Sequence, residues 1–170
     1  NYAHTIYSDD HGATWKLGSN TPQAMMNETT VAEISGGRLM LNMRNANRKI
    51  KTRQTSISND GGHTWTDVVR DTTLIEPICQ GTLLNTPNGK QLFFANPAHK
   101  VKRLNLTLRS SNDDGKTWAS SKVIHTGPSA YSDIAIYKKK NLAILYESGV
   151  EKPYEGIAFK LVSLKEAVKP

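Results

Sequence analysis

One eight-residue pattern, Ser-x-Asp-x-Gly-x-Thr-Trp, occurs three times in this chain of 170 residues, and its copies hold all three tryptophans. The copies are SDDHGATW at 8–15, SNDGGHTW at 58–65 and SNDDGKTW at 111–118. Successive copies begin 50 and 53 residues apart. Periods of this size are typical of solenoids and of propeller blades, so the pattern predicts a repeat architecture.

The segments between the copies predict short β-strands. They are rich in Val, Ile, Leu, Phe and Thr and are separated by Gly, Asn and Asp turns. The predicted strands cover 4–7, 30–34, 38–44, 51–58, 91–95, 105–111, 133–137, 142–147 and 156–162. Only 161–168 shows a helical period. About four strands per repeat indicate an all-β chain built from propeller blades.

The octapeptide itself has the chemistry of a hairpin corner. Its Ser and Asp side chains form hydrogen bonds with nearby backbone, as in an Asx turn. Its Gly supplies a positive φ, and its Trp is expected to bury a large ring between neighbouring strands. We therefore interpret the pattern as a structural staple rather than a ligand site.

Charge and composition exclude little. The net charge of +7 suits nucleic acid, anionic surfaces or an acidic small ligand without choosing among them. We interpret the run Lys138 to Lys140 as a solvated turn, and we expect no nucleic-acid partner. No apolar run approaches the roughly 20 residues of a membrane span. The one cysteine, Cys79, is expected to be a small buried residue.

Four segments between and beyond these turns resemble the sialidase (neuraminidase) family, whose octapeptides are called Asp-boxes and whose catalytic domain is a six-bladed β-propeller. They occur in the family's order, cover nearly the whole chain and are most similar to bacterial members. The segments are MNETTVAEISGGRLMLNMRN at 26–45, LIEPICQGTLL at 74–84 with LFFANPA at 92–98, RLNLTLRSSNDDGKTW at 103–118, and GPSAYSDIAIYKKKNLAILYESG at 127–149.

The resemblance implies a role for five residues. Tyr131 stands at the position of the family's nucleophile and Glu28 at that of the glutamate assisting it. Arg44 and Arg103 match two of the three arginines that bind the substrate carboxylate, and Gln80 is a candidate contact to the substrate's polar tail.

The chemistry accounts for these residue types. Sialic acid carries a carboxylate on its anomeric carbon, and the planar fork of arginine binds a carboxylate with two charge-assisted hydrogen bonds. A carboxylate nucleophile would be repelled by that group, whereas a phenol is neutral, and sialidases are known to use tyrosine. A phenol with a pKa near 10 needs a general base such as Glu28, and neighbouring arginines are expected to favour the phenolate.

Each residue also has a plainer interpretation when it is taken alone. Tyr131 fits a packing position, Glu28 a turn carboxylate, and Arg44 and Arg109 solvated strand residues. We interpret Glu147 as structural. The five histidines show no ligand spacing, so we expect no metal site, and the resemblance implies no cofactor.

The family's first arginine, in a Phe/Tyr-Arg-x-Pro motif, and its acid/base aspartate have no counterpart in this chain. The first residues also lack the basic and apolar regions of a signal peptide. We therefore expect residues 1–170 to be the C-terminal half of a catalytic domain, completed by another chain or by a missing segment and active only with it. By resemblance alone, the protein is expected to be secreted, periplasmic or on the surface of a bacterium.

The predicted function is that of an exo-α-sialidase, a glycoside hydrolase that releases terminal sialic acid from glycoproteins, glycolipids or oligosaccharides with retention. Two alternatives stay open: a propeller that binds sialoglycans without chemistry, and a trans-sialidase or a variant that forms an anhydro sugar. A binding protein has no need of an activated phenol, so the pair of Tyr131 and Glu28 favours an enzyme.

Overall fold

The computed structural model describes residues 1–169 and contains twelve β-strands within them. The strands are β1 (His4–Tyr7), β2 (Lys16–Asn20), β3 (Met26–Ile34), β4 (Arg38–Asn45), β5 (Thr52–Ser58), β6 (Val69–Ile75), β7 (Thr82–Asn85), β8 (Leu92–Pro97), β9 (Leu104–Ser111), β10 (Ser120–Tyr137), β11 (Asn141–Ser148) and β12 (Gly156–Ser163). A short 3-10 turn, Ser35–Gly37, precedes β4, and α1 (Leu164–Ala167) follows β12.

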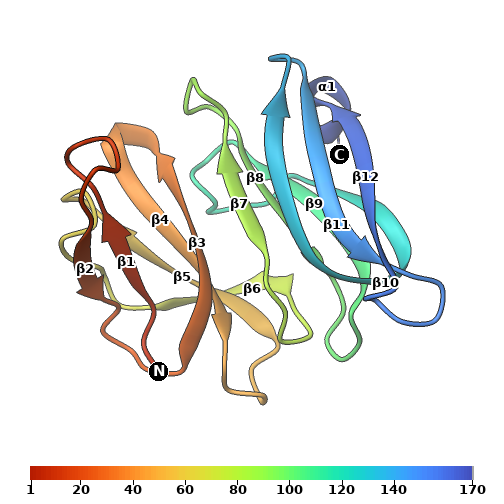
Figure 1. Ribbon diagram of the computed structural model, residues 1–170, viewed down its shortest axis with the longest axis horizontal. Coiled ribbons are helices and arrows are strands. Elements are labelled where there is room, and N and C mark those ends of the chain that lie inside the picture. The colour runs from red at the N-terminus through yellow and green to blue at the C-terminus, as the bar shows by residue number, and fades with distance from the viewer. Residues whose placement is uncertain (170) are drawn as a thin grey trace.

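The strands form antiparallel sheets that follow one another along the chain (Figure 1). The sheet β3-β4-β5-β6 is one four-stranded blade, and β1-β2 is a two-stranded hairpin beside it. The remaining six strands lie in the order β12-β11-β10-β9-β8-β7. Strand β10 is 18 residues long and belongs to two blades, because its first half pairs with β9 and its second half with β11.

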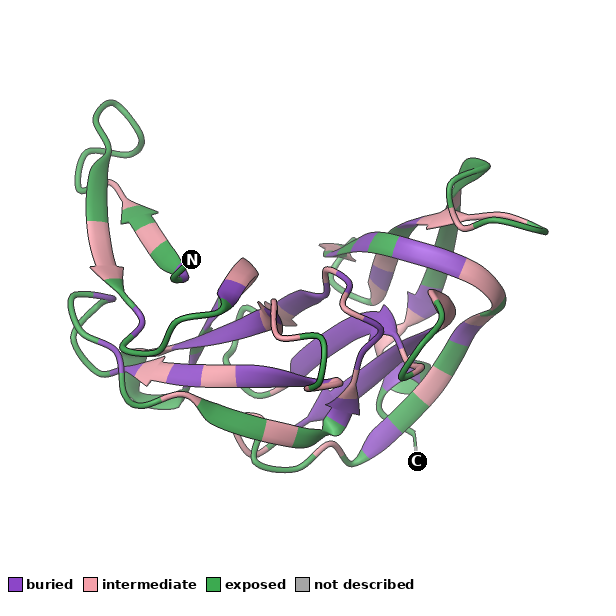
Figure 2. Cartoon of the chain, turned by 90° about the horizontal axis from the view of Figure 1, so that it is seen from below, coloured by how far each residue is buried: buried purple, intermediate pink, exposed green. Residues whose placement is uncertain are grey.

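Buried residues, coloured purple in Figure 2, lie mainly on the strands, and many of them are apolar. The largest cluster lies under β8 to β12 and includes Phe93, Leu106 and Ile144, and a second joins β3, β4, β7 and β8 around Phe94. The β1-β2 hairpin contributes little to this core and is mostly exposed (Figure 2).

The Asp-boxes form the hairpin corners that the sequence predicts. In the second box, the hydroxyl of Ser58 accepts from Gly62 N at 2.8 Å, and Asp60 accepts from the backbone and the hydroxyl of Thr64 at 2.9 and 2.6 Å. Gly62 has a φ of +93°. The other two boxes repeat the same bonds.

The tryptophans of the boxes are not equally buried, so the prediction that each ring is buried between strands is wrong for one of them. Trp65 is 9% exposed, whereas Trp15 is 62% exposed. Trp118 is half-buried and donates from Nε1 to Asp71 at 2.8 Å. Trp15 stays open because its box joins β1 and β2, which form a sheet of only two strands.

The predicted strands all appear, and Lys138 to Lys140 form an exposed turn as predicted. The structure adds β2, β6, β7 and the first half of β10. The predicted helical segment 161–168 is shorter than its period indicates, because residues 161–163 still pair with β11. Among residues 1–169, no helix has the length and apolar character needed to cross a membrane.

Candidate active site

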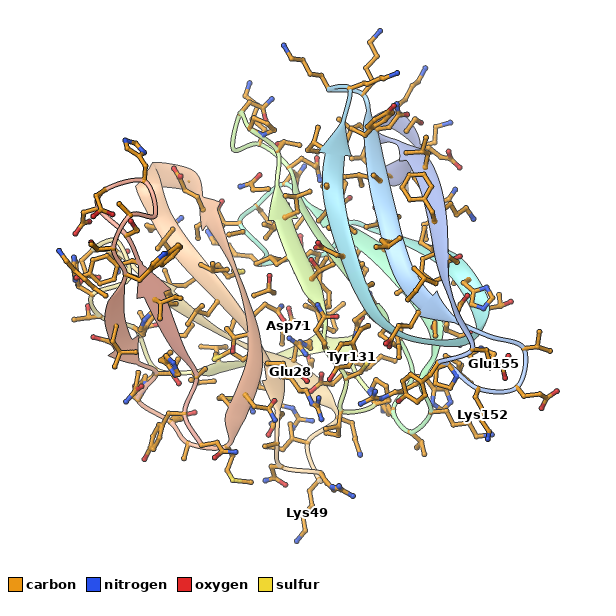
Figure 3. All side chains as sticks on the ribbon, viewed as in Figure 1. Glu28, Lys49, Asp71, Tyr131, Lys152 and Glu155 are labelled. Atoms are coloured by element: carbon orange, nitrogen blue, oxygen red, sulfur yellow. The ribbon has the colours of Figure 1, made fainter. Side chains whose placement is uncertain are left out.

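Glu28 and Tyr131 each lie on a β-bulge, and they come from two different sheets. Between Met26 and Thr29, β3 has one residue more than the paired stretch of β4, and between Ser129 and Ser132, β10 has one more than β11. An extra residue bends a strand and redirects its side chains. The two bulges therefore turn these two side chains toward each other from different blades (Figure 3).

Arg44 completes a hydrogen-bonded cluster with this pair. The hydroxyl of Tyr131 donates to Oε1 of Glu28, and Nη1 of Arg44 donates to the other carboxylate oxygen and, at 3.2 Å, to the phenol oxygen. Arg44 is half-buried at the end of β4, so its interpretation as a freely solvated residue is wrong. The cluster joins a candidate base, a candidate nucleophile and a cation.

The surroundings keep Glu28 ionised. Partial burial raises the pKa of its carboxyl, but the hydrogen bonds from Tyr131 and Arg44 and the charges of Arg44 and Arg103 outweigh burial, and the pKa lies below its ordinary value. A carboxylate that is ionised at neutral pH is ready to accept a proton.

The same surroundings keep Tyr131 protonated. Burial raises the pKa of its phenol, and the hydrogen bond to Glu28 and the charge of that carboxylate raise it further. Arg44 and Arg103 lower the pKa, as predicted, but do not reverse the shift. The expectation that the arginines favour the phenolate therefore holds in direction only, because burial and the carboxylate of Glu28 together outweigh them. The raised pKa leaves the phenol of Tyr131 protonated beside the carboxylate of Glu28.

Arg103 lies against the face of Tyr131, with its guanidinium carbon 5.5 Å from the ring centroid. Its Nη1 donates to the hydroxyl of Tyr154 at 2.7 Å, and its Nη2 donates to the carbonyl of Ile78 at 3.0 Å. Ile78 has a φ of +59°, which a β-branched residue rarely adopts. The backbone is thus held in a strained conformation that presents a carbonyl to Arg103.

Sequence reasoning missed Tyr154. It is 60% exposed in the loop between β11 and β12, where no strand pattern or motif distinguishes it from a surface aromatic. Its hydroxyl accepts from Arg103 and retains its own proton for donation.

Gln80 and Cys79 lie in the segment before β7. The amide of Gln80 donates to the carbonyl of Ser132 at 3.0 Å and accepts from its N–H at 3.1 Å, which fixes the backbone next to Tyr131. Cys79 is fully buried, as predicted, and burial raises the pKa of its thiol to about 11. Such a thiol is inert at neutral pH.

The two remaining charged candidates have structural contacts. Glu147 accepts from the N–H of Tyr131 at 2.9 Å. Arg109, interpreted from sequence as solvated, is instead 7% exposed and donates to Asn96 at 3.1 Å, because its position on β9 faces the sheet interior. Within residues 1–169, no group of three His, Cys, Asp or Glu side chains is arranged to hold a metal ion.

Antiparallel blades with Asp-box corners, arranged around a Tyr–Glu–Arg cluster, define an Asp-box β-propeller protein. The chain belongs to the BNR repeat-like domain family, whose model matches residues 1–144.

Three proteins that are similar to this chain are sialidases. The chain is 37% identical over 153 residues to a sialidase of Micromonospora viridifaciens, covering 85% of this chain and 23% of that protein. It is 34% identical over 174 residues to a sialidase of Bacteroides fragilis, covering 96% of this chain and 31% of that protein. The solved structure of the Hadza microbial sialidase Hz136 aligns with a TM-score of 0.82 at 35% identity, over 94% of this chain and 32% of that one.

These likenesses confirm the predicted resemblance to bacterial sialidases and the predicted all-β fold, about half of a six-bladed β-propeller. The chain spans about a quarter to a third of the length of these three relatives.

Proposed function

We propose that this chain supplies the nucleophile, its base and two carboxylate-binding arginines of a retaining exo-α-sialidase acting on sialylated glycans. The observation that carries the proposal is the hydrogen bond from Tyr131 to Glu28 beside Arg44. An ionised base in contact with a phenol is the arrangement that nucleophilic catalysis by tyrosine needs.

In the proposed first step, the phenol oxygen of Tyr131 attacks the anomeric carbon while its proton passes to Glu28. The carboxylate of Glu28 becomes neutral as the phenolate develops, so the unfavourable negative charge beside the phenol oxygen disappears. The arginines stabilise the negative charge that develops on that oxygen. We expect the leaving-group oxygen to be protonated by the aspartate that the family resemblance places upstream of this chain. A water molecule, which loses a proton to that aspartate, then attacks the anomeric carbon. The bond to Tyr131 breaks, the phenolate takes its proton back from Glu28, and two inversions give overall retention.

Arg44 and Arg103 are proposed to hold the substrate carboxylate. Both lie within contact of Tyr131, so a carboxylate bound by them would place the anomeric carbon beside the phenol oxygen. Tyr154 adds a hydroxyl donor next to Arg103. We propose Gln80 as a positioning residue as well as a candidate contact to the polar tail, because its amide holds Ser132.

The test is incubation of the full-length protein containing this chain with 3'-sialyllactose, followed by NMR of the products over time. Release of α-sialic acid before mutarotation supports the proposal. An anhydro sugar or a transfer product would identify the related variants that share these residues. A protein that binds the substrate and leaves it intact would be a binding propeller, and the proposal would fail.

A further inference from the structure

One short segment, residues 76–81 between β6 and β7, contacts both halves of the candidate site. The carbonyl of Ile78 accepts from Arg103, and the side chain of Gln80 holds the backbone of Ser132 next to Tyr131. Glu76 accepts from the backbone N–H of Asn45, the residue after Arg44, at 3.1 Å. The position of this segment therefore sets Arg44 on one blade relative to Tyr131 and Arg103 on the others.

A buried ion pair holds the segment in place. Nη1 of Arg53, on β5, lies 2.8 Å from Oε2 of Glu76, and both side chains are 0% exposed. The same Nη1 donates to the carbonyl of Cys79 at 2.8 Å. Nε and Nη2 of Arg53 donate to the side-chain and backbone oxygens of Asn42 at 2.7 and 3.2 Å. One guanidinium thus links β4, two residues before Arg44, to both ends of the strained turn at Ile78.

Stability alone does not account for a charged pair at this place. Removing two charges from water is unfavourable, and replacing such a pair by apolar side chains of similar volume is often neutral or stabilising. The apolar neighbours are already present, since the guanidinium of Arg53 lies 5.6 Å from the ring centroid of Phe94. What an apolar pair cannot reproduce is the directed set of bonds to Asn42, Asn45 and Cys79.

We propose that the Arg53–Glu76 pair is a positioning device that sets the distance between Glu28 with Arg44 and Tyr131 with Arg103. The proposal rests on the function proposed above. Neither residue is in contact with the phenol, so both act through the segment 76–81. A shift of about 1 Å between reacting groups lowers rates by about 100-fold, which is the scale of effect expected.

The decisive variant is the double replacement Arg53→Met/Glu76→Met in the full-length protein. We expect a lower melting temperature, because Asn42, Asn45 and Cys79 lose buried hydrogen bonds. In the folded protein we expect a fall in kcat of about 100-fold and a smaller change in KM. Arg53→Lys, which keeps the charge and loses the fork, should give an intermediate loss. Arg38→Met is the matched control, because it removes an ion pair with Asp114 at the other end of β4.

Two pH measurements separate positioning from a merely structural role. Partial burial raises the pKa of Glu28, and its bonds to Tyr131 and Arg44 lower it below the ordinary value. If those bonds loosen, the acidic limb of the kcat/KM profile should move to higher pH in the double variant. The phenol of Tyr131, followed by ultraviolet titration against Tyr131→Phe, should titrate at lower pH than in the wild type, because Glu28 no longer raises its pKa. This second readout needs no activity.

The outcomes are distinct. A folded double variant with wild-type kcat, acidic limb and phenol titration would overturn the inference while leaving the proposed function intact. If the double variant does not fold, Arg53→Lys is judged by the same three readouts. An active Tyr131→Phe protein would overturn the proposed function instead, and the phenol titration would still decide the inference.

Discussion

The hydroxyl of Tyr131 donates a hydrogen bond to the carboxylate of Glu28 across 103 residues of sequence, from one blade to another. Burial and this bond raise the pKa of Tyr131, while the same bond and Arg44 outweigh burial and lower the pKa of Glu28. At neutral pH the proton therefore resides on the phenol and the charge on the carboxylate. The proposed nucleophile has to be generated during the reaction, which makes the pair a unit.

Tyr131→Phe is expected to lower kcat by about thousands-fold with an unchanged melting temperature, because it removes the attacking oxygen and nothing from the core. The measurement is turnover of a fluorogenic sialoside by the full-length protein. Tyr137→Phe, an exposed residue on the same strand, is the control. Near-normal turnover by Tyr131→Phe would remove this residue from the mechanism.

Glu28→Gln is expected to lower both the turnover and the pKa of Tyr131. Burial, the largest cause of the raised pKa of Tyr131, remains in the variant. The hydrogen bond to a carboxylate and the negative charge of that carboxylate are lost, so the pKa should fall. Ultraviolet titration of the variant against the wild type measures the shift. A phenol that titrates at the same pH as in the wild type, or at a higher pH, would show that Glu28 does not raise the pKa of Tyr131.

Arg103→Lys and Arg44→Lys should each raise the activation barrier by roughly 2 kcal/mol, about 30-fold in kcat/KM, because an ammonium retains the charge and loses the fork. Arg48→Lys, at an exposed loop position, serves as the control. Arg109→Lys is unsuitable for that purpose, since the side chain is buried. Wild-type kinetics for Arg103→Lys would refute its proposed role.

Trp65→Ala and Trp15→Ala form a matched pair that tests whether the Asp-boxes stabilise the fold or bind the substrate. Trp65 is buried, so its loss should lower the free energy of unfolding by about 3–5 kcal/mol through lost burial and a cavity. Trp15 is exposed, and its loss should change that free energy by less than about 0.5 kcal/mol. Chemical denaturation measures both. A changed KM with unchanged stability in Trp65→Ala would make the box a ligand site.

The Asp-boxes should also make stability depend on pH in acid. The hydrogen bonds from the side chain and backbone of Thr64, and from Ser58, lower the pKa of Asp60 to about 2. Its value in the unfolded chain is about 3.9, so Asp60 stabilises the fold above that pH and loses the effect as pH falls through about 2. Asp60→Asn should therefore lower stability at about pH 6, and the difference from wild type should shrink toward about pH 2. A constant difference would contradict this linkage.

The boxes, most of the strands and four of the candidate residues could be found without a structure. The boxes depend on contacts within eight residues, where one Ser, one Asp and one Gly already satisfy the turn. The strands follow from alternation and from turn residues, which are also local. Tyr131, Glu28, Arg44 and Arg103 entered through the family resemblance, and the structure brings all four together.

Among the strands that the sequence did not predict, β6 and β7 were missed because their apolar signal is weak. β6 carries Arg, Asp and Thr at most positions and is largely exposed, and β7 has four residues. Arg109 shows the opposite error: a charged residue was expected in water, but its strand position faces inward and Asn96 accepts its hydrogen bond.

The amino-acid sequence by itself determined the hairpin corners, the strand periodicity and the candidate site residues, because those depend on neighbouring residues or on a motif. Only the tertiary structure decided the rest. The two bulges that turn Glu28 and Tyr131 toward each other are register shifts between paired strands. Likewise, the contact of Tyr154 with Arg103 and the burial of Arg53 with Glu76 join residues 51 and 23 positions apart. Pairing register and burial are properties of packed strands, so no local pattern encodes them.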